Sequence, residues 1–315
     1  MYSAIYINMR TTILSDASIV ADRSVATIGF FDGVHIGHQY LLRRVIDASR
    51  ECGMASMAIT FDRHPRTVTD TGFTPSLLST LDEKLDLIAS TGIDHCVILP
   101  FTKEMSRMSA CCFMDDILKT RLNTGKLFLG YDNRFGHNRS ETFEDYVRYG
   151  TELGIDIIRN DALEVHGMKV SSSAIRRFVK QGNMENACEC LGRPYSMTGT
   201  VVGGYKKGRK IGFPTANIEL ADSMRLIPAT GVYAVKIRIG ESQEAMPGML
   251  NIGYRPTFGG NRLSIEVNIF DFDGDLYGRQ LTVEFHRRIR DERKFDSIEA
   301  LAEQIAIDRK TIEKI

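Results

Sequence analysis

The spacing of hydrophobic positions divides the chain into two parts. Between Val25 and about Asp161, short apolar runs alternate with stretches in which apolar residues recur every three to four positions. The first pattern predicts buried strands and the second predicts amphipathic helices. We expect strands at residues 25–31, 54–61, 95–99, 126–130 and 155–159, and helices at 38–52, 76–90, 109–122, 142–153, 172–181 and 184–191. Their alternation predicts an α/β fold with a Rossmann-like parallel sheet covered on both sides.

Beyond about Tyr195 the pattern changes to strict alternation. Val235, Ile237 and Ile239, for example, alternate with charged residues. A period of two predicts strands with one buried face. We expect about five strands, at 198–202, 235–239, 246–252, 263–269 and 281–285, followed by a helix around 297–306. Glycine-rich connections between such strands predict a small antiparallel β-barrel domain with a C-terminal helix.

Length and charge narrow the picture further. The 315 residues are enough for two domains with separate cores, and we place them at 1–190 and 191–315. Lys and Arg together number 40, as do Asp and Glu. A dedicated nucleic-acid binder usually carries a basic excess, so we expect small-molecule partners and no nucleic acid.

The cysteines and the apolar runs bear on the cell compartment. The six cysteines have neither Cys-x-x-Cys spacing nor the density of a secreted disulfide scaffold, so reduced thiols are expected. The first residues lack the pattern of a secretory signal, and the chain has no long uncharged apolar run. These features predict a cytoplasmic protein without a membrane partner; they leave its oligomeric state open.

The first candidate site is the segment Gly29–His38, Gly-Phe-Phe-Asp-Gly-Val-His-Ile-Gly-His. It joins a predicted strand to a predicted helix, where glycines and helix N–H groups can hold phosphate. The paired histidines are alternatively metal ligands or structural side chains. Together with the downstream Lys169-Val-Ser-Ser-Ser, they favour imidazoles that bind nucleotide triphosphate during nucleotidyl transfer. The candidate ATP-binding residues in this segment are Gly29, Phe30, Phe31, Gly33, His35 and His38.

Two other strand ends carry polar residues that we expect near the same edge of the sheet. Asp62 and His64 follow one predicted strand, and Asp132 follows another, within the glycine-bounded segment 130–136. In open parallel sheets, ligands bind beyond the carboxyl ends of the strands. The alternative is that Asp62 and His64 only cap a turn before Pro65.

The second candidate site is the segment 203–217, Gly-Gly-Tyr-Lys-Lys-Gly-Arg-Lys-Ile-Gly-Phe-Pro-Thr-Ala-Asn. Its glycines and cations suit polyphosphate, with Gly208 and Lys210 as candidate ATP ligands. Thr215 and Asn217 offer neutral oxygens that suit Mg²⁺. The segment lacks the Walker pattern, and its alternative interpretation is a solvated basic loop.

Glu266 lies on a predicted strand, on the face opposite Ile265 and Val267. An ordinary exposed carboxylate is one interpretation. In a phosphoryl-transfer enzyme, a carboxylate in this place can accept the proton of an attacking hydroxyl.

Six motifs, taken together and in order, resemble the prokaryotic bifunctional riboflavin kinase/FAD synthetase family. They cover nearly the whole chain. They are Gly29–His38, Thr-Phe-Asp-Arg-His-Pro at 60–65, Val-Ser-Ser-Ser-Ala-Ile-Arg at 170–176, Gly-Phe-Pro-Thr-Ala-Asn at 212–217, Asn-Ile-Gly-Tyr-Arg-Pro-Thr-Phe at 251–258 and Glu-Val-Asn-Ile-Phe-Asp-Phe at 266–272. The resemblance implies that the C-terminal barrel phosphorylates riboflavin to FMN and that the N-terminal domain transfers AMP from ATP to FMN. Both steps would require Mg²⁺.

The resemblance also implies roles for residues of the N-terminal domain. His35 and His38 would bind the ATP phosphates from one side. Asp62 and Asp132 would line the adenylylation site. The residues that bind ATP from the far side would be Ser172, Ser173 and Arg176.

In the kinase domain, the resemblance implies that Glu266 is the base for the ribityl hydroxyl. Thr215 and Asn217 would hold Mg²⁺ and phosphate, and Asn251 and Arg293 would contact the flavin.

The chain departs from the family pattern at three positions. Asn133 replaces a usual aromatic residue, Arg63 a common proline and Asn268 a common histidine. Two other functions remain as alternatives. A tRNA-charging nucleotidyltransferase shares the histidine and serine motifs in kind, and a non-catalytic flavin-binding protein would leave Glu266 without a task.

Overall fold

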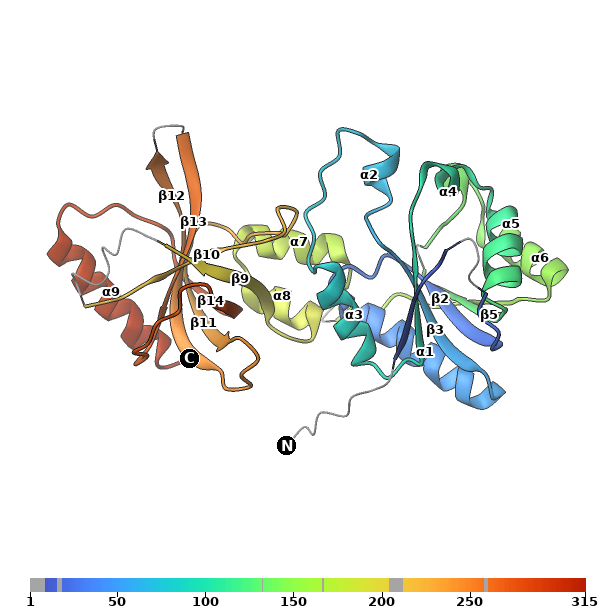
Figure 1. Ribbon diagram of the computed structural model, residues 1–315, viewed down its shortest axis with the longest axis horizontal. Coiled ribbons are helices and arrows are strands. Elements are labelled where there is room, and N and C mark those ends of the chain that lie inside the picture. The colour runs from blue at the N-terminus through green and yellow to red at the C-terminus, as the bar shows by residue number, and fades with distance from the viewer. Residues whose placement is uncertain (1–8, 16–18, 132, 166, 204–211, 258–259) are drawn as a thin grey trace. The chain divides into compact units, whose positions relative to one another are not determined.

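A six-stranded parallel sheet forms the first part of the computed structural model, which describes residues 9–15, 19–131, 133–165, 167–203, 212–257 and 260–315 (Figure 1). The strand order is β1-β4-β3-β2-β5-β6. The strands are β1 (Arg10–Ile13), β2 (Ser24–Ile28), β3 (Ala55–Phe61), β4 (His95–Leu99), β5 (Thr124–Leu129) and β6 (Asp156–Arg159). The order reverses at β2, because β3 lies on one side of it and β5 on the other. Ligands bind at such a reversal in open parallel sheets.

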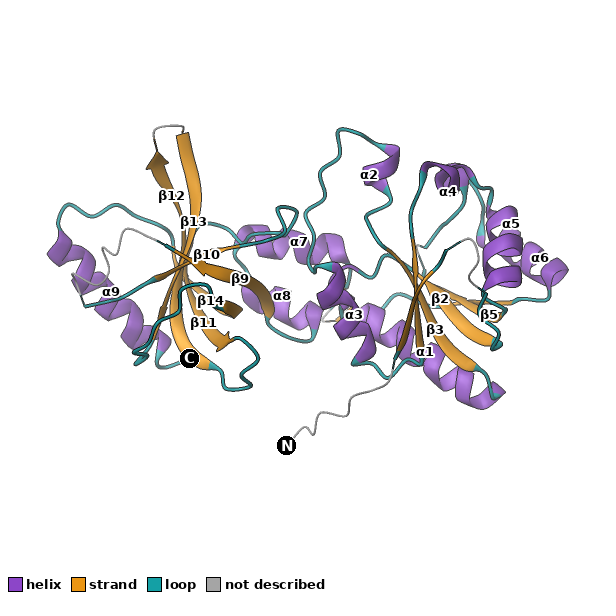
Figure 2. Ribbon diagram, viewed as in Figure 1, coloured by secondary structure: helices purple, strands orange, loops and turns teal. Residues whose placement is uncertain are grey.

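Helices cover both faces of this sheet (Figure 2). The helical segments are η1 (Asp32–Val34), α1 (Ile36–Cys52), α2 (Arg66–Thr69), α3 (Leu81–Ala89), α4 (Lys103–Arg107), α5 (Ala110–Cys112), the π-helix η2 (Phe113–Arg121), η3 (His137–Arg139) and α6 (Phe143–Leu153). A short hairpin follows, formed by β7 (Glu164–Val165) and β8 (Met168–Lys169).

Two apolar clusters separate the faces. One joins Val25, Ala58 and Phe128 of the sheet to α1 and α3. The other joins Ile28 and Leu127 to η2 and α6. Successive strand residues point to opposite faces, so strands buried on both sides read as continuous apolar runs in the sequence.

A closed antiparallel barrel forms the second part. Its strand order is β10-β13-β12-β11-β14-β9. The strands are β9 (Tyr195–Val202), β10 (Ala216–Glu219), β11 (Gly231–Ile239), β12 (Met246–Thr257), β13 (Gly260–Ile269) and β14 (Gln280–Arg290). The helix α9 (Ile298–Ile312) packs outside, where Ile312 joins a cluster with Val232, Ala234 and Met249. Side chains of the alternate residues, such as Tyr233, Leu250 and Phe285, fill the interior.

Two further helices, α7 (Ser172–Gln181) and α8 (Met184–Leu191), pack largely with the barrel. Contacts between Cα atoms divide the chain into units at residues 1–172 and 173–315. The Ala229 N–H donates to the Val179 carbonyl at 3.3 Å, and Arg287 forms an ion pair with Glu185 at 2.8 Å. Gly182, in the turn between the helices, has a φ of 74°, and a Cβ there would lie 2.4 Å from Cδ of Arg288, so the turn favours glycine. The division at 190/191 stays a prediction from the sequence.

The structure confirms the predicted fold class and corrects several elements. The strand expected at 25–31 ends at Ile28, and the helix expected at 76–90 begins at Leu81. The helix expected at 109–122 is the short α5 followed by a π-helix. The strands β1 and β10 and the two-residue strands β7 and β8 were missed. None of them is longer than four residues, so they carry little periodic signal.

Candidate functional sites

A backbone turn of unusual geometry connects β2 to α1. Phe31 and Val34 have positive φ angles of 54° and 37°, and Gly33 has 73°. Such angles cost free energy for residues with a Cβ, and they persist only where surrounding contacts fix them. Phe31 and Val34 are both buried, so packing holds the turn in place.

The predicted histidine pair lies directly after this turn. His35 is the N-cap of α1, and its Nδ1 accepts from the His38 N–H at 3.3 Å. This bond leaves the proton of a neutral His35 on Nε2. The two imidazole rings stack with their centroids 3.6 Å apart. A Cβ on Gly37 would lie 3.2 Å from the His35 ring, so glycine lets this ring fold over the helix start. The structure thus places both imidazoles at the positive end of a helix.

Asp32 has a structural task that the sequence did not reveal. Its buried carboxylate accepts from the Leu78 N–H at 2.9 Å and the Ser79 N–H at 3.2 Å. The Gly33 N–H donates to Ser79 Oγ at 3.0 Å. These bonds tie the segment before α3 to the turn before α1.

Asp62 follows β3, next to this turn along the edge of the sheet. Its Oδ1 accepts from the Phe101 N–H at 2.9 Å, and its Oδ2 pairs with Arg63 at 2.8 Å. Burial raises the pKa of Asp62, but the bonds from Arg63 and Phe101 outweigh burial and hold that pKa below its ordinary value. His64 caps the following turn, as its Nδ1 accepts from the Arg66 N–H at 3.2 Å, and its ring contacts Phe30 with centroids 4.9 Å apart. His64 therefore caps the turn before Arg66, and Asp62 remains a candidate site residue.

The exit of β5 forms a small cavity of about 50 Å³, lined in part by Tyr131, Asn133 and Glu141. The Asn133 amide donates to the carbonyl of Ile28, which joins this exit to the end of β2. Asp132, a predicted ATP ligand, lies outside the described residues.

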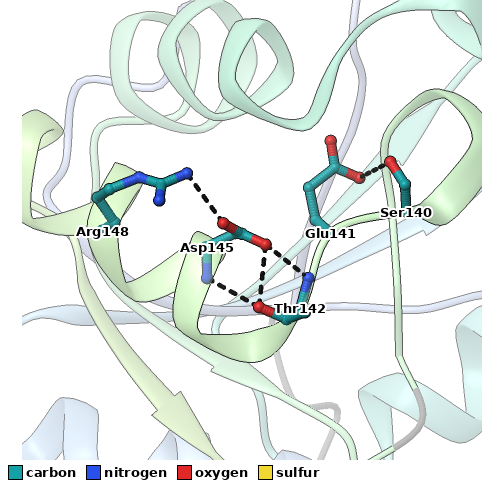
Figure 3. Close-up of polar contacts among 5 residues, drawn as sticks. All are labelled: Ser140, Glu141, Thr142, Asp145 and Arg148. Carbon is teal, nitrogen blue, oxygen red and sulfur yellow. Dashed lines mark hydrogen bonds and ion pairs between the residues drawn. The ribbon is translucent and has the colours of Figure 1, made fainter.

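The helix α6 begins beside this cavity with a reciprocal cap (Figure 3). The Asp145 N–H donates to Thr142 Oγ1 at 3.3 Å, and the Thr142 N–H donates to Asp145 Oδ2 at 2.9 Å. The backbone N–H and hydroxyl of Thr142 hold the pKa of Asp145 below its ordinary value. Ser140 donates to Glu141 at 3.4 Å just before the cap. The cap therefore fixes where the chain turns at the cavity wall.

The serine motif begins at the end of the first unit. Ser172 Oγ donates to the Asp32 carbonyl at 3.1 Å, which brings this predicted residue to the histidine turn. Ser173 and Arg176 lie on α7 in the second unit.

In the barrel, three predicted residues form one row across neighbouring strands. Glu266 on β13 is paired with Asn217 on β10 and with Asn251 on β12. Residues directly opposite on antiparallel strands have side chains on the same face. The buried neighbours of Glu266 on β13, Ile265 and Val267, face the barrel interior, so the row lies on the outer face. Ser264 Oγ donates to Glu266 Oε1 at 3.4 Å.

A cavity of about 570 Å³ adjoins this row. Thr215 and Asn217 line it together with residues of β9, β13 and the segment 272–277. The buried Asn268 donates from Nδ2 to the Pro214 carbonyl at 2.6 Å, which fixes the backbone just before Thr215. Gly208 and Lys210 lie outside the described residues.

Arg293 lies in the segment between β14 and α9. It contacts the Phe295 ring at 4.6 Å and donates to Gln304 of α9. These contacts hold the segment against the helix and do not include the row at Glu266.

Two family models match the two parts of the chain. The FAD synthetase model covers residues 18–174, and the riboflavin kinase model covers residues 191–315. A bifunctional riboflavin kinase/FMN adenylyltransferase of Escherichia coli K12 is 37% identical over 287 residues, which is 91% of each chain. The chain belongs to the bifunctional riboflavin kinase/FMN adenylyltransferase family.

Other members of this family agree with that assignment. The enzyme of Pseudomonas fluorescens is 37% identical and that of Bacillus subtilis is 36% identical, each over at least 90% of both chains. A crystal structure described as a macrolide-efflux protein from Streptococcus pneumoniae has a TM-score of 0.89 and 31% identity, and it covers 98% of this chain and 100% of its own. That protein and this chain therefore share the same fold. No helix among the described residues is long and apolar enough to cross a membrane.

Proposed function

We propose that this member of the riboflavin kinase/FMN adenylyltransferase family works at two separate sites. The barrel phosphorylates riboflavin to FMN, and the carboxyl edge of the parallel sheet transfers AMP from ATP to FMN with release of pyrophosphate. The observation that carries the proposal is that each family model matches a part of the chain with its own cluster of predicted residues. The whole-length match leaves the tRNA-charging and flavin-carrier alternatives without support.

At the adenylylation site, His35 and His38 bind the ATP phosphates. Their place at the N-terminus of α1 supports this role, because the positive end of the helix dipole favours anions. The bonds from Arg63 and Phe101, which hold the pKa of Asp62 below its ordinary value, favour the ionised carboxylate, and this suits a group that orients substrate. Gly29, Phe30, Phe31 and Gly33 form the approach to the phosphates. The remaining proposed ATP ligands are Asp132, Ser172, Ser173 and Arg176.

At the kinase site, Glu266 accepts the proton of the terminal ribityl hydroxyl as that oxygen attacks the γ-phosphate of ATP. Asn217 and Asn251, on either side of Glu266, orient the substrates around it. Gly208 and Lys210 contact the ATP phosphates. Asn251 and Arg293 contact the flavin.

The donor set of the barrel fits Mg²⁺. Thr215 and Asn217 offer two neutral oxygens beside the large cavity. Mg²⁺ is typically held by few protein ligands plus water and phosphate oxygens, so these residues would bind it together with ATP. The ion would neutralise charge on the phosphates.

The partners in this proposal are riboflavin, FMN and ATP. The equal numbers of basic and acidic residues support the proposal that nucleic acid is not a partner. The six free cysteines support a location in the cytoplasm.

A direct assay tests both activities. The purified protein is incubated with riboflavin, ATP and Mg²⁺, and the flavins are separated by chromatography. We expect FMN first and FAD afterwards. Unchanged riboflavin would overturn the kinase proposal. Failure to form FAD when FMN is supplied directly would overturn the adenylylation proposal independently.

A further inference from the structure

A buried lysine lies at the carboxyl ends of two neighbouring strands. Lys84, on α3, is only 3% exposed. Its Nζ donates to the carbonyl of Phe61, the last residue of β3, at 3.0 Å and to the carbonyl of Phe30, just beyond β2, at 3.3 Å. Nζ also lies 4.4 Å from the centre of the Phe30 ring, within cation–π range. One ammonium therefore holds the exits of two strands.

The two carbonyls belong to peptide groups that lead directly into the adenylylation site. The Phe30 carbonyl is part of the peptide group before Phe31, whose φ of 54° begins the turn to His35. The Phe61 carbonyl is part of the peptide group before Asp62. Because peptide groups are planar, fixing a carbonyl fixes the direction in which the chain leaves it.

The helix that carries Lys84 is itself bound to the same turn. Asp32 accepts from the backbone N–H groups of Leu78 and Ser79, just ahead of the Thr80 cap of α3. Thr60 Oγ1 adds a second donor to the Phe30 carbonyl at 3.2 Å. The turn is thus held from two directions: Thr60 at the end of β3 and Lys84 on α3 bind the Phe30 carbonyl, and Lys84 also binds the carbonyl of Phe61.

Keeping the Lys84 side chain charged in this buried position is unfavourable in free energy. Burial lowers the pKa of Lys84 to about 8, although Cys96, Asp32 and Asp62 act to raise it. Burial also raises the pKa of Cys96 to about 12, which keeps that thiol neutral. A buried ammonium generally costs folding free energy relative to an apolar side chain of similar size. A lysine kept in such a place suggests a role beyond packing.

We propose that Lys84 is a positioning residue of the adenylylation site, which orients the turn to His35 and His38 and the segment at Asp62 by binding the Phe30 and Phe61 carbonyls together. This inference rests on the proposed adenylylation of FMN in the first unit. The riboflavin kinase site in the second unit does not depend on it.

The test compares Lys84→Met, which keeps the length and removes every donor, with Lys84→Gln, which keeps a donor without the charge. Lys103→Met, on the exposed face of α4, is the matched control. FAD formation from supplied FMN and ATP is measured from pH 6.5 to 9.5, with riboflavin phosphorylation as an internal control. Circular dichroism gives the folded fraction at the assay temperature.

We expect Lys84→Met to lower kcat for FAD formation at least tenfold at pH 7, Lys84→Gln to recover part of it, and the control to match the wild type. The wild-type rate should also fall as pH rises through about 8, and Lys84→Met should lack this step. Wild-type rates and pH profiles in both folded variants would overturn the proposal, as would losses that only follow the unfolded fraction. If the wild type itself forms no FAD, the proposed function fails instead.

Discussion

Asn217 and Glu266 lie directly opposite each other on the antiparallel strands β10 and β13. They are 49 residues apart in the sequence, and the pairing places their side chains on one face of the barrel. A proposed Mg²⁺ ligand and the proposed base are therefore neighbours at the same site. Barrel closure, which joins β10 to β9 and β13, is what holds them there.

Replacing Glu266 by Gln should lower kcat for FMN formation by about 10²–10⁴-fold, because a positioned general base contributes that much. FAD formation from supplied FMN should be unchanged. The control is Glu284→Gln, which alters a carboxylate paired with Arg238 elsewhere in the barrel. Loss of both activities in folded Glu266→Gln would contradict two independent sites.

Replacing Gly37 by Ala should impair FAD formation. The new Cβ would lie 3.2 Å from the His35 ring and displace it. Misplacement of a catalytic group by an ångström can cost about 100-fold, so we expect a loss of about 10- to 100-fold in kcat. Gly72→Ala, where the nearest atom would be 3.6 Å away, is the control. A normal rate of FAD formation in Gly37→Ala would argue against a role for the His35 ring.

Replacing Asn268 by Ala should weaken MgATP binding in the kinase reaction. It removes the hydrogen bond that fixes the Pro214 carbonyl before Thr215. A net loss of about 1 kcal/mol corresponds to a KM for ATP raised about fivefold. Asn268→His, which introduces the residue common in the family, should retain more affinity than Asn268→Ala. Equal KM values in all three proteins would show that this bond does not shape the site.

Lys84 should make the stability of the first unit depend on alkaline pH. The folded state releases its proton near pH 8, whereas the unfolded state keeps it to about 10.5. Between these values the unfolded state binds more protons, so the free energy of unfolding rises with pH, by up to about 3 kcal/mol. Denaturant titrations from pH 7 to 10 should show this rise in the wild type but not in Lys84→Met. Identical slopes would mean that Lys84 is not buried as a cation.

Replacing Asp308 by Ala should destabilise the barrel. Asp308 is 2% exposed and accepts from Arg290 at 2.8 Å and from Gln304 at 2.7 Å. Removing one partner of a buried pair typically costs about 3–5 kcal/mol. Asp271→Ala breaks an ion pair whose carboxylate is largely exposed, and should cost no more than about 1 kcal/mol. Thermal unfolding midpoints of the two variants give the comparison.

The sequence predicted the two architectures because both carry strong periodic signals. Buried parallel strands read as apolar runs, and barrel strands as alternation. It also singled out the members of the row at Glu266 separately. That these residues lie side by side depends on the register between strands that are distant in the sequence. The hydrophobic periodicity of a single strand gives no information about this register.

The missed features are contacts rather than motifs. Asp32 is part of the histidine motif, yet its task depends on Leu78 and Ser79, and nothing local indicates that pairing. For Lys84, the sequence contains one indication of an unusual role. It shares a helix face with the buried Ile88, and a lysine on an apolar face is unusual. Its two carbonyl partners could be known only from the fold.

The packing of α7 and α8 against the barrel bears on how the two activities can be separated. Their apolar residues Ile175, Phe178 and Met184 are buried, and Val179 and Glu185 bond to the barrel. In a fragment that ends at residue 190, these apolar side chains of α7 and α8 would lose the barrel that covers them. We expect such a fragment to aggregate. A gene split between the two activities would have to keep this helix pair with the kinase half, although its first turn carries part of the adenylylation motif.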